Sequence, residues 1–244
     1  MTNPRNPRPA ARPSGLRLIS IAAGSAALAF AATTLAAAPQ VAGDAYVYQR
    51  VNGYNKETRG KLRYEVTRVE GGRVTVNVTP DNPDAGTPRT VVYNLEGNWL
   101  RHEVENHGAK IDYEFAEAYP AYVTPLETGR SWSQRVKATV ADESRPRSVR
   151  VDGKVLGAER IRVPAGEFDT IKIRRYVYPG DHAFMLSETY VTEIDWYAPA
   201  LGRAVRTERD SRYLDLQACS GFARCEARGD WDIYELVEAR PAKR

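Results

Sequence analysis

The sequence predicts a mainly β protein: a single large curved antiparallel sheet or an incomplete β-barrel, with few short helices. Beyond residue 38, apolar and polar residues alternate nearly everywhere, which places successive side chains on opposite faces of a sheet. No segment of fifteen or more residues shows the 3.6-residue period of an amphipathic helix. Long alternation with one apolar face favours antiparallel pairing.

Residues 1–38 have the pattern of a secretory signal peptide. The first seventeen residues are proline-rich, contain no acidic residue and carry four arginines, at Arg5, Arg8, Arg12 and Arg17. An uncharged, alanine-rich stretch follows and ends in Ala36-Ala37-Ala38, an A-x-A pattern that a signal peptidase reads. Because Pro39 disfavours cleavage just before it, sites after Ala36 or nearer Gly43 compete. We expect an exported, periplasmic or secreted protein without a stable transmembrane segment; a retained membrane anchor is the alternative.

The basic character of the chain lies in this leader. The full chain has 35 Lys and Arg against 31 Asp and Glu, so removing the four leader arginines leaves 31 of each. A neutral surface with mixed signs gives no electrostatic basis for binding nucleic acid. Residues 39–244 have the length of one β domain.

The first predicted strands form a meander. Residues 62–66 and 74–78 alternate in register around Gly71-Gly72, a glycine pair that supplies a positive-φ hairpin turn. The same alternation continues over 90–95, 99–104 and 111–115, although residues 114–122 are also compatible with a short helix.

The second half of the chain continues this pattern. Alternating segments cover residues 136–140, 149–151, 171–178, 190–196 and 231–236. The fourteen tyrosines and four tryptophans are expected mainly in the core, since a one-sided sheet buries large flat residues and leaves their polar tips at its rim. An aromatic concave face that holds a lipid or glycan is the alternative.

Two local motifs are expected to be architectural. In Val163-Pro164-Ala165-Gly166-Glu167-Phe168-Asp169, Pro164 ends a strand, Gly166 permits a positive φ, and Phe168 returns to the core. The second motif, residues 195–205, carries the aromatic pair Trp196-Tyr197, followed by a turn at Pro199 and Gly202. Trp196 and Tyr197 are the ligand-binding candidates in this sequence.

These motifs, with Gly129-Arg130-Ser131-Trp132 before them, resemble a family of exported bacterial proteins, mostly of unknown function. In that family V-x-V-P-A-G-x-F-D precedes W-Y-A-P-x-x-G-x-V by roughly 30 residues. The resemblance covers about residues 125–206. It implies a curved antiparallel sheet or incomplete barrel similar to the periplasmic lipoprotein carriers, and it carries over no catalytic residue.

Cys219 and Cys225 are the only cysteines, and we expect them to form a disulfide in an oxidising compartment. Closing so short a loop contributes only about 2.4 kcal/mol by chain entropy. A redox or metal role normally needs closer spacing or added histidines.

No catalytic or metal motif is complete, and no cofactor is predicted. His102 and His107 are one residue too far apart for H-E-x-x-H, and Gly129-Arg130-Ser131-Trp132-Ser133 lacks the last glycine of a nucleophile elbow. Carboxylates at Asp169, Glu188, Glu193 and Asp195 are expected on solvated faces, although a pair of them would suit a glycosidase.

Three hypotheses about function follow. The first is a non-catalytic exported protein whose curved sheet binds an apolar or amphipathic ligand, or an envelope partner. The second is a hydrolase of envelope polymers that uses an unrecognised carboxylate pair. The third is a structural or interaction module without a small ligand, which an exposed apolar patch or an unpaired edge strand would indicate.

Overall fold

The structure, a computed structural model, describes residues 38–106, 109–180, 182–183, 186–215 and 226–242. These residues belong to one compact unit. The leader, His107, Cys219 and Cys225 lie outside the described residues, so the signal peptide and the disulfide stay predictions.

The described chain is mainly β-strand, as the sequence predicted. Two 3₁₀ helices, η1 (Pro83–Ala85) and η2 (Pro199–Leu201), interrupt the strands. The strands are β1 (Ala45–Asn52), β2 (Thr58–Glu70), β3 (Arg73–Pro80), β4 (Arg89–Asn94), β5 (Trp99–Asn106), β6 (Ala109–Tyr119), β7 (Ser131–Val140), β8 (Arg147–Val163), β9 (Gly166–Tyr178), β10 (His182–Ala183), β11 (Leu186–Ala198), β12 (Arg203–Asp215) and β13 (Glu226–Arg240).

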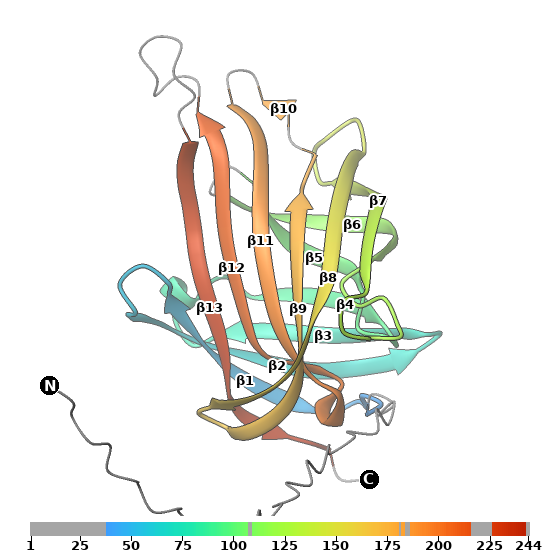
Figure 1. The fold of residues 1–244 in the computed structure, drawn as a ribbon, viewed down its shortest axis with the longest axis vertical. Helices are drawn as coiled ribbons and strands as arrows, with labels where there is room; N and C mark the ends of the chain where they lie inside the picture. Colours follow the sequence, from blue (N-terminus) through green and yellow to red (C-terminus); the bar gives the residue numbers. More distant parts are fainter. Residues whose placement is uncertain (1–37, 107–108, 181, 184–185, 216–225, 243–244) are drawn as a thin grey trace, which may run out of the picture. The chain divides into compact units, whose positions relative to one another are not determined.

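The strands form a closed 12-stranded antiparallel barrel (Figure 1). Each strand pairs with its neighbours in sequence, except that β9 pairs with β11 and the two-residue β10 adds only to β11. The barrel closes where β13 pairs with β1, from Ala45 opposite Arg240 to Asn52 opposite Asp232. The predicted open sheet or incomplete barrel is therefore wrong. Alternation assigns residues to faces, but it does not show whether the first and last strands meet.

The segment that was compatible with a short helix is mostly strand. β6 runs to Tyr119 and contacts β5 through an irregular register, with Trp99 opposite Tyr119 and Arg101 opposite Glu114. Tyr113, Phe115 and Tyr119 are buried and pack against one another, and this packing overrides the local helical tendency. No described helix is long and apolar enough to cross a membrane.

Large side chains fill the interior. One apolar cluster lies among β1–β4 and β11–β13 and reaches the β8–β9 turn, and Leu62, Val76 and Leu236 are among its most deeply buried members. A second lies among β5–β9 and β11, around Tyr113 and Val151. A barrel of about eight strands has an interior that ordinary side chains fill. A barrel of twelve strands is wider, so filling its interior requires longer side chains such as those of Tyr, Trp and Arg.

The two sequence motifs lie at one end of the barrel. Pro164 and Gly166 form the β8–β9 turn, where the Ala165 amide donates to the Leu236 carbonyl at 3.0 Å and Phe168 packs against the first cluster. Pro199 begins η2 and Gly202 ends it with a φ of 63°. A Cβ on Gly202 would lie 2.4 Å from the Ala38 carbonyl oxygen, so both conformation and space require glycine there.

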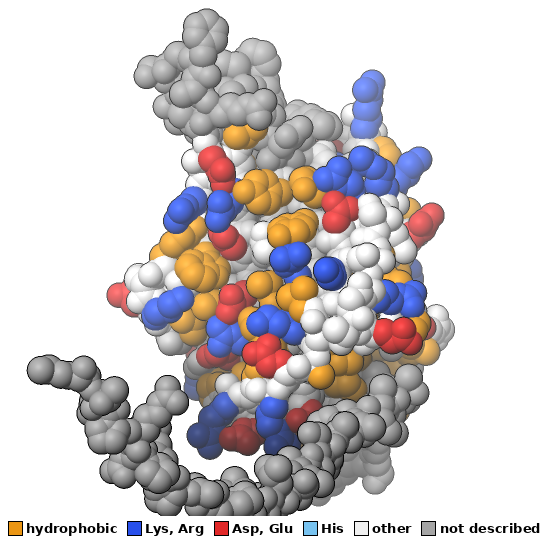
Figure 2. Space-filling model, in the orientation of Figure 1, with side chains coloured by type: hydrophobic (Ala, Val, Ile, Leu, Met, Phe, Trp, Pro, Cys, Tyr) orange, Lys and Arg blue, Asp and Glu red, His pale blue; other side chains and the backbone are white. Residues whose placement is uncertain are grey.

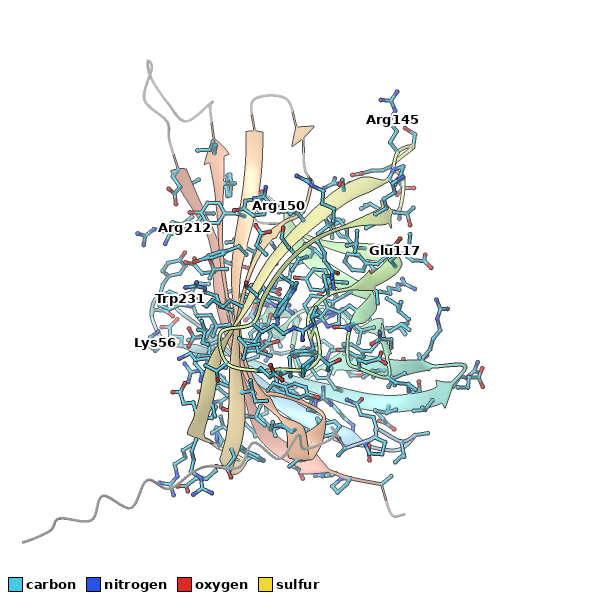
Figure 3. The ribbon with its side chains drawn as sticks, turned by 45° about the vertical axis from the view of Figure 1, so that its right-hand side comes forward. Lys56, Glu117, Arg145, Arg150, Arg212 and Trp231 are labelled. Carbon is cyan, nitrogen blue, oxygen red and sulfur yellow. The ribbon has the colours of Figure 1, made fainter. Side chains whose placement is uncertain are left out.

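Two tryptophans lie directly over glycines: Trp132 on β7 over Gly153 on β8, and Trp231 on β13 over Gly53, which follows β1. A Cβ on Gly153 would lie 2.1 Å from the Trp132 ring, and one on Gly53 would lie 2.2 Å from Trp231. The Lys56 ammonium also lies over Trp231, 4.3 Å from the ring centre (Figure 3). Each indole ring occupies the space that a side chain at the glycine position would need.

Gly153→Ala is expected to lower the free energy of unfolding by about 1–3 kcal/mol, because the new methyl group overlaps the Trp132 ring. Urea denaturation measures the loss. The matched control is the same substitution in a Trp132→Ala background, where the ring is absent and the penalty should largely vanish. An equal penalty in both backgrounds would contradict this explanation.

Candidate functional site

A ladder of alternating charge crosses the inside of the barrel. Arg175 on β9 pairs in register with Glu193 on β11, Glu193 with Arg209 on β12, and Arg209 with Asp232 on β13. Each lies in the inward phase of its strand; Arg175, for example, lies between the buried residues Ile173 and Val177. We call Arg175, Glu193, Arg209 and Asp232 the charge ladder.

Arg175 is fully buried, with 0% of its surface exposed, and each of its three guanidinium nitrogens donates a hydrogen bond. Its Nε donates to Glu193 Oε2 at 3.0 Å, its Nη2 to Asp195 Oδ2 at 2.8 Å, and its Nη1 to the Ala121 carbonyl at 3.2 Å. Burial lowers the pKa of this guanidinium, but Asp195 and Glu193 outweigh burial and hold the pKa well above its usual value. Arg175 therefore stays charged and fixes β9 to β11.

Asp195 and Glu193 are occupied by protein donors. Asp195 also accepts hydrogen bonds from the Tyr122 and Thr207 hydroxyls, both at 2.7 Å. Glu193 accepts from Tyr119 at 3.1 Å, and its Oε1 lies 3.2 Å from Arg209 Nε. Burial raises the pKa of Asp195, but Arg175 and the hydroxyl donors outweigh it and hold the pKa below its usual value. A catalytic acid needs the opposite shift.

A second ion cluster ends the ladder at β13 and β1. Asp232 accepts from Arg50 Nη2 and from Lys110 Nζ, both at 2.8 Å, and from the Tyr234 hydroxyl at 3.3 Å. Burial raises the pKa of Asp232, while the Arg50 hydrogen bond and the Lys110 charge lower it to a net value below normal. These contacts join β13 to β1 and β6 across the interior.

His102 contributes a buried donor without a partner. Its ring stacks on Trp99 with centroids 3.8 Å apart, and only 4% of the residue is exposed. Burial and the nearby Arg209 lower the pKa of His102 well below its usual value, so the ring is neutral. Nε2 lies 2.9 Å from Arg209 Nη2, which can only donate, so Nε2 accepts and Nδ1 carries the proton. Nδ1 is buried and has no hydrogen-bond partner within the part of the chain that the structure describes.

A partly open cleft of about 90 Å³ lies beside the charge ladder. Arg203, Arg209, Asp195, Thr207 and His102 supply polar groups to its wall. The aromatic lining consists of Tyr48, Tyr64, Tyr93, Trp99, Tyr122 and Tyr234. A cleft of flat rings with a few charged groups is typical of a site for a small organic ligand.

Arg203 differs from the other interior cations because it has no carboxylate partner among the described residues. The Gly202 turn directs it inward at the start of β12. Its guanidinium lies 3.8 Å from the centre of the Tyr46 ring and 5.3 Å from that of Tyr48. Its Nε and Nη1 atoms are shielded from solvent and donate no hydrogen bond to any described residue. Arg203 therefore presents uncompensated positive charge to the cleft.

The predicted ligand-binding candidates lie elsewhere. Trp196 is outside the cleft, between Lys172 and Arg206, and its Nε1 donates to Glu159 at 3.1 Å. Tyr197 is buried and packs on Tyr122, with ring centroids 4.6 Å apart, but it does not line the cleft.

Sequence reasoning missed the inward arginines and His102. One signal was present: Arg175, Arg209 and His102 each share a phase with buried residues of their own strand. Within the described residues, no three side chains among His, Cys, Asp and Glu are grouped so as to hold a metal ion.

No family model and no curated protein matches this chain. Three solved structures overlap it in part. The first is a candidate lipoprotein from Parabacteroides distasonis, with 16% sequence identity and a TM-score of 0.49 over 83% of this chain and 97% of that one. The second is a candidate exported protein with a YmcC-like fold from Bacteroides fragilis, with 14% identity and a TM-score of 0.44 over 84% of this chain and 98% of that one. The third is the hypothetical lipoprotein YmcC from Escherichia coli, with 11% identity and a TM-score of 0.42 over 81% of this chain and 86% of that one.

His102 makes stability depend on pH. Because its folded pKa lies below the ordinary value of 6.5, the unfolded chain binds a proton that the folded chain does not. The free energy of unfolding should fall by about 1.4 kcal/mol per pH unit below pH ~6.5, until the folded pKa is reached. The His102→Gln variant keeps a hydrogen-bond acceptor for Arg209, but glutamine does not titrate. The free energy of unfolding of this variant should therefore fall less with decreasing pH than that of the unmodified protein. Urea denaturation at pH 7 and pH 5 tests this, and parallel losses in both proteins would refute it.

Proposed function

We propose that this chain is a non-catalytic exported protein that binds an amphipathic ligand inside its barrel, with an acidic group of the ligand held by Arg203. The observation that carries this proposal is the unpaired Arg203 guanidinium in an aromatic cleft. The ligand hypothesis from the sequence is retained, but its site moves from an open curved sheet to the interior of a closed barrel.

Buried donors without a partner make the folded protein less stable and favour a ligand that pairs with them. Leaving a buried polar group without a partner costs about 1–3 kcal/mol, and more when the group is charged. Arg203 and His102 Nδ1 both bear this cost, whereas each carboxylate of the charge ladder is saturated. A carboxylate or phosphate suits the planar guanidinium fork. The tyrosine rings around it suit an apolar body next to that group.

The size of the cleft limits the part of the ligand that enters. One water needs about 10–15 Å³ of such space, so a cleft of about 90 Å³ takes a group of several heavy atoms, such as one ring or a short chain. Since the cleft is partly open, the rest of a larger ligand extends outward.

The other hypotheses have less support. The interior carboxylates Glu193 and Asp195 are bound by Arg175 and by hydroxyl donors, which is unlike a hydrolytic acid pair. The large apolar side chains exposed on the described surface, Tyr54, Leu95 and Leu156, come from three different parts of the chain and form no common hydrophobic cluster.

The direct test compares benzoate with its neutral analogue benzamide by isothermal titration calorimetry. We expect the anion to bind better, and we expect Arg203→Gln to weaken benzoate roughly 10–100-fold, the loss of a charge-assisted hydrogen bond. Arg68→Gln, at an exposed ion pair on β2, is the matched control and should bind as the unmodified protein does. Equal binding of benzoate by the Arg203 variant and the control would overturn the proposal.

The natural ligand is sought by solvent extraction and mass spectrometry of the protein purified from its native envelope. An organic acid should copurify with the unmodified chain and be depleted from Arg203→Gln. Extracts without any such acid would count against a stably bound ligand.

A further inference from the structure

We propose that the outer face of β7, β8 and β9 docks this protein on a bilayer that contains anionic phospholipid. The proposal does not depend on the cleft. It rests on four cations, Arg135, Arg150, Lys154 and Arg174, which we call the basic face. Figure 2 shows Lys and Arg side chains gathered at the upper right of the molecule, where β7 and β8 run in Figure 1.

Strand alternation directs the basic face outward. On β8, Arg150 and Lys154 alternate with the buried residues Val149, Val151 and Val155. Arg135 and Lys154 are exposed, and Arg150 and Arg174 are half-buried. The cations therefore come from three adjacent strands of one sheet, at a strand spacing of about 4.8 Å.

Two pairs of like charge lie directly opposite each other. Arg135 on β7 is in register with Arg150 on β8, and Lys154 on β8 is in register with Arg174 on β9. Like charges at opposed positions destabilise a sheet. Both like-charge pairs are nevertheless present in this barrel. Elsewhere on the outer surface a cation has an acidic neighbour instead: Arg101 forms an ion pair at 2.6 Å with Asp112, which lies diagonally across on the next strand. Such a cost is expected where the charges serve an external partner.

The basic face is poorly neutralised. Arg150 lies 3.2 Å from Asp152, its neighbour on β8. Among the described residues, Arg135, Lys154 and Arg174 form no ion pair with a carboxylate. The four cations thus face one acid, and the net positive charge is open to solvent.

Tyrosines interleave with these cations. The Arg150 guanidinium lies 3.8 Å from the Tyr178 ring centre, and that of Arg174 lies 5.0 Å from the Tyr176 ring centre. Leu156, which is 37% exposed, follows Lys154 on β8. Tyrosine beside Lys and Arg is the composition of a surface at lipid headgroup level, where the rings enter the interface and the cations meet phosphate. This mixture favours a bilayer over a soluble acidic polymer.

The test measures co-sedimentation of the full chain, purified as the cell processes it, with lipid vesicles. Vesicles of phosphatidylcholine are compared with vesicles in which one third of the lipid is phosphatidylglycerol. A hydrophobic anchor would bind both kinds, so the ratio of the two affinities reports the charge-dependent part. We expect clear preference for the phosphatidylglycerol vesicles, weakened by added salt.

The decisive variant is Arg135→Gln with Lys154→Gln, which removes one member of each like-charge pair. Each Lys or Arg near an anionic membrane contributes about 1 kcal/mol, roughly fivefold in affinity, so the double variant should bind about 25-fold more weakly. Its thermal midpoint should stay the same or rise, because repulsion is relieved. A purely structural role would lower the midpoint instead.

The matched control is Arg63→Gln with Arg68→Gln on β2, where each arginine already pairs with a glutamate. It should retain its vesicle binding. The proposal is overturned if both double variants lose binding equally, if the basic-face variant binds as the unmodified chain does, or if the chain ignores phosphatidylglycerol and binds soluble polyglutamate instead.

Discussion

The charge ladder inside the barrel is the constraint on which the rest of the structure depends. Removing a charge from water costs several kcal/mol, so Arg175, Glu193, Arg209 and Asp232 are tolerated only with every partner in place. Their pairing is in register across four strands. A slip of one residue would turn each inward charge to the outside and leave its partner unpaired. The ladder therefore favours one register for β9, β11, β12 and β13 over its alternatives.

The same constraint explains the position of the cleft. A barrel of twelve strands is wider than apolar side chains alone fill, and the ladder fills part of it with long residues of alternating charge. Beyond the ladder, Arg203 enters from the end of the barrel, and no carboxylate of the described residues pairs with it. The cleft is thus the place where the internal balance of charge is left incomplete, and the proposed binding of an anion there follows from this imbalance.

Much of the fold followed from local alternation, because strands and their order depend on neighbouring residues. The phase of Arg175, between Ile173 and Val177, was also visible in the sequence. Its partners were not, since Glu193 is 18 residues away and meets Arg175 only through the β9–β11 register. Closure depends on β1 and β13, the most distant strands. Trp196 looked like a ligand contact because it is large and belongs to the aromatic pair of the second motif, yet it is buried in the first apolar cluster and does not line the cleft.

Adjacent residues on β9 show how the sheet separates two kinds of interaction. Arg175 points inward and is bound by two carboxylates, so its loss would leave two buried negative charges without a partner. Arg174 points outward, opposite Lys154, so its loss would relieve repulsion. The two residues are chemically identical and consecutive, but their energetic roles have opposite signs. Only the period of the strand distinguishes them, because it places one guanidinium among interior carboxylates and the other beside a second cation on the outer face.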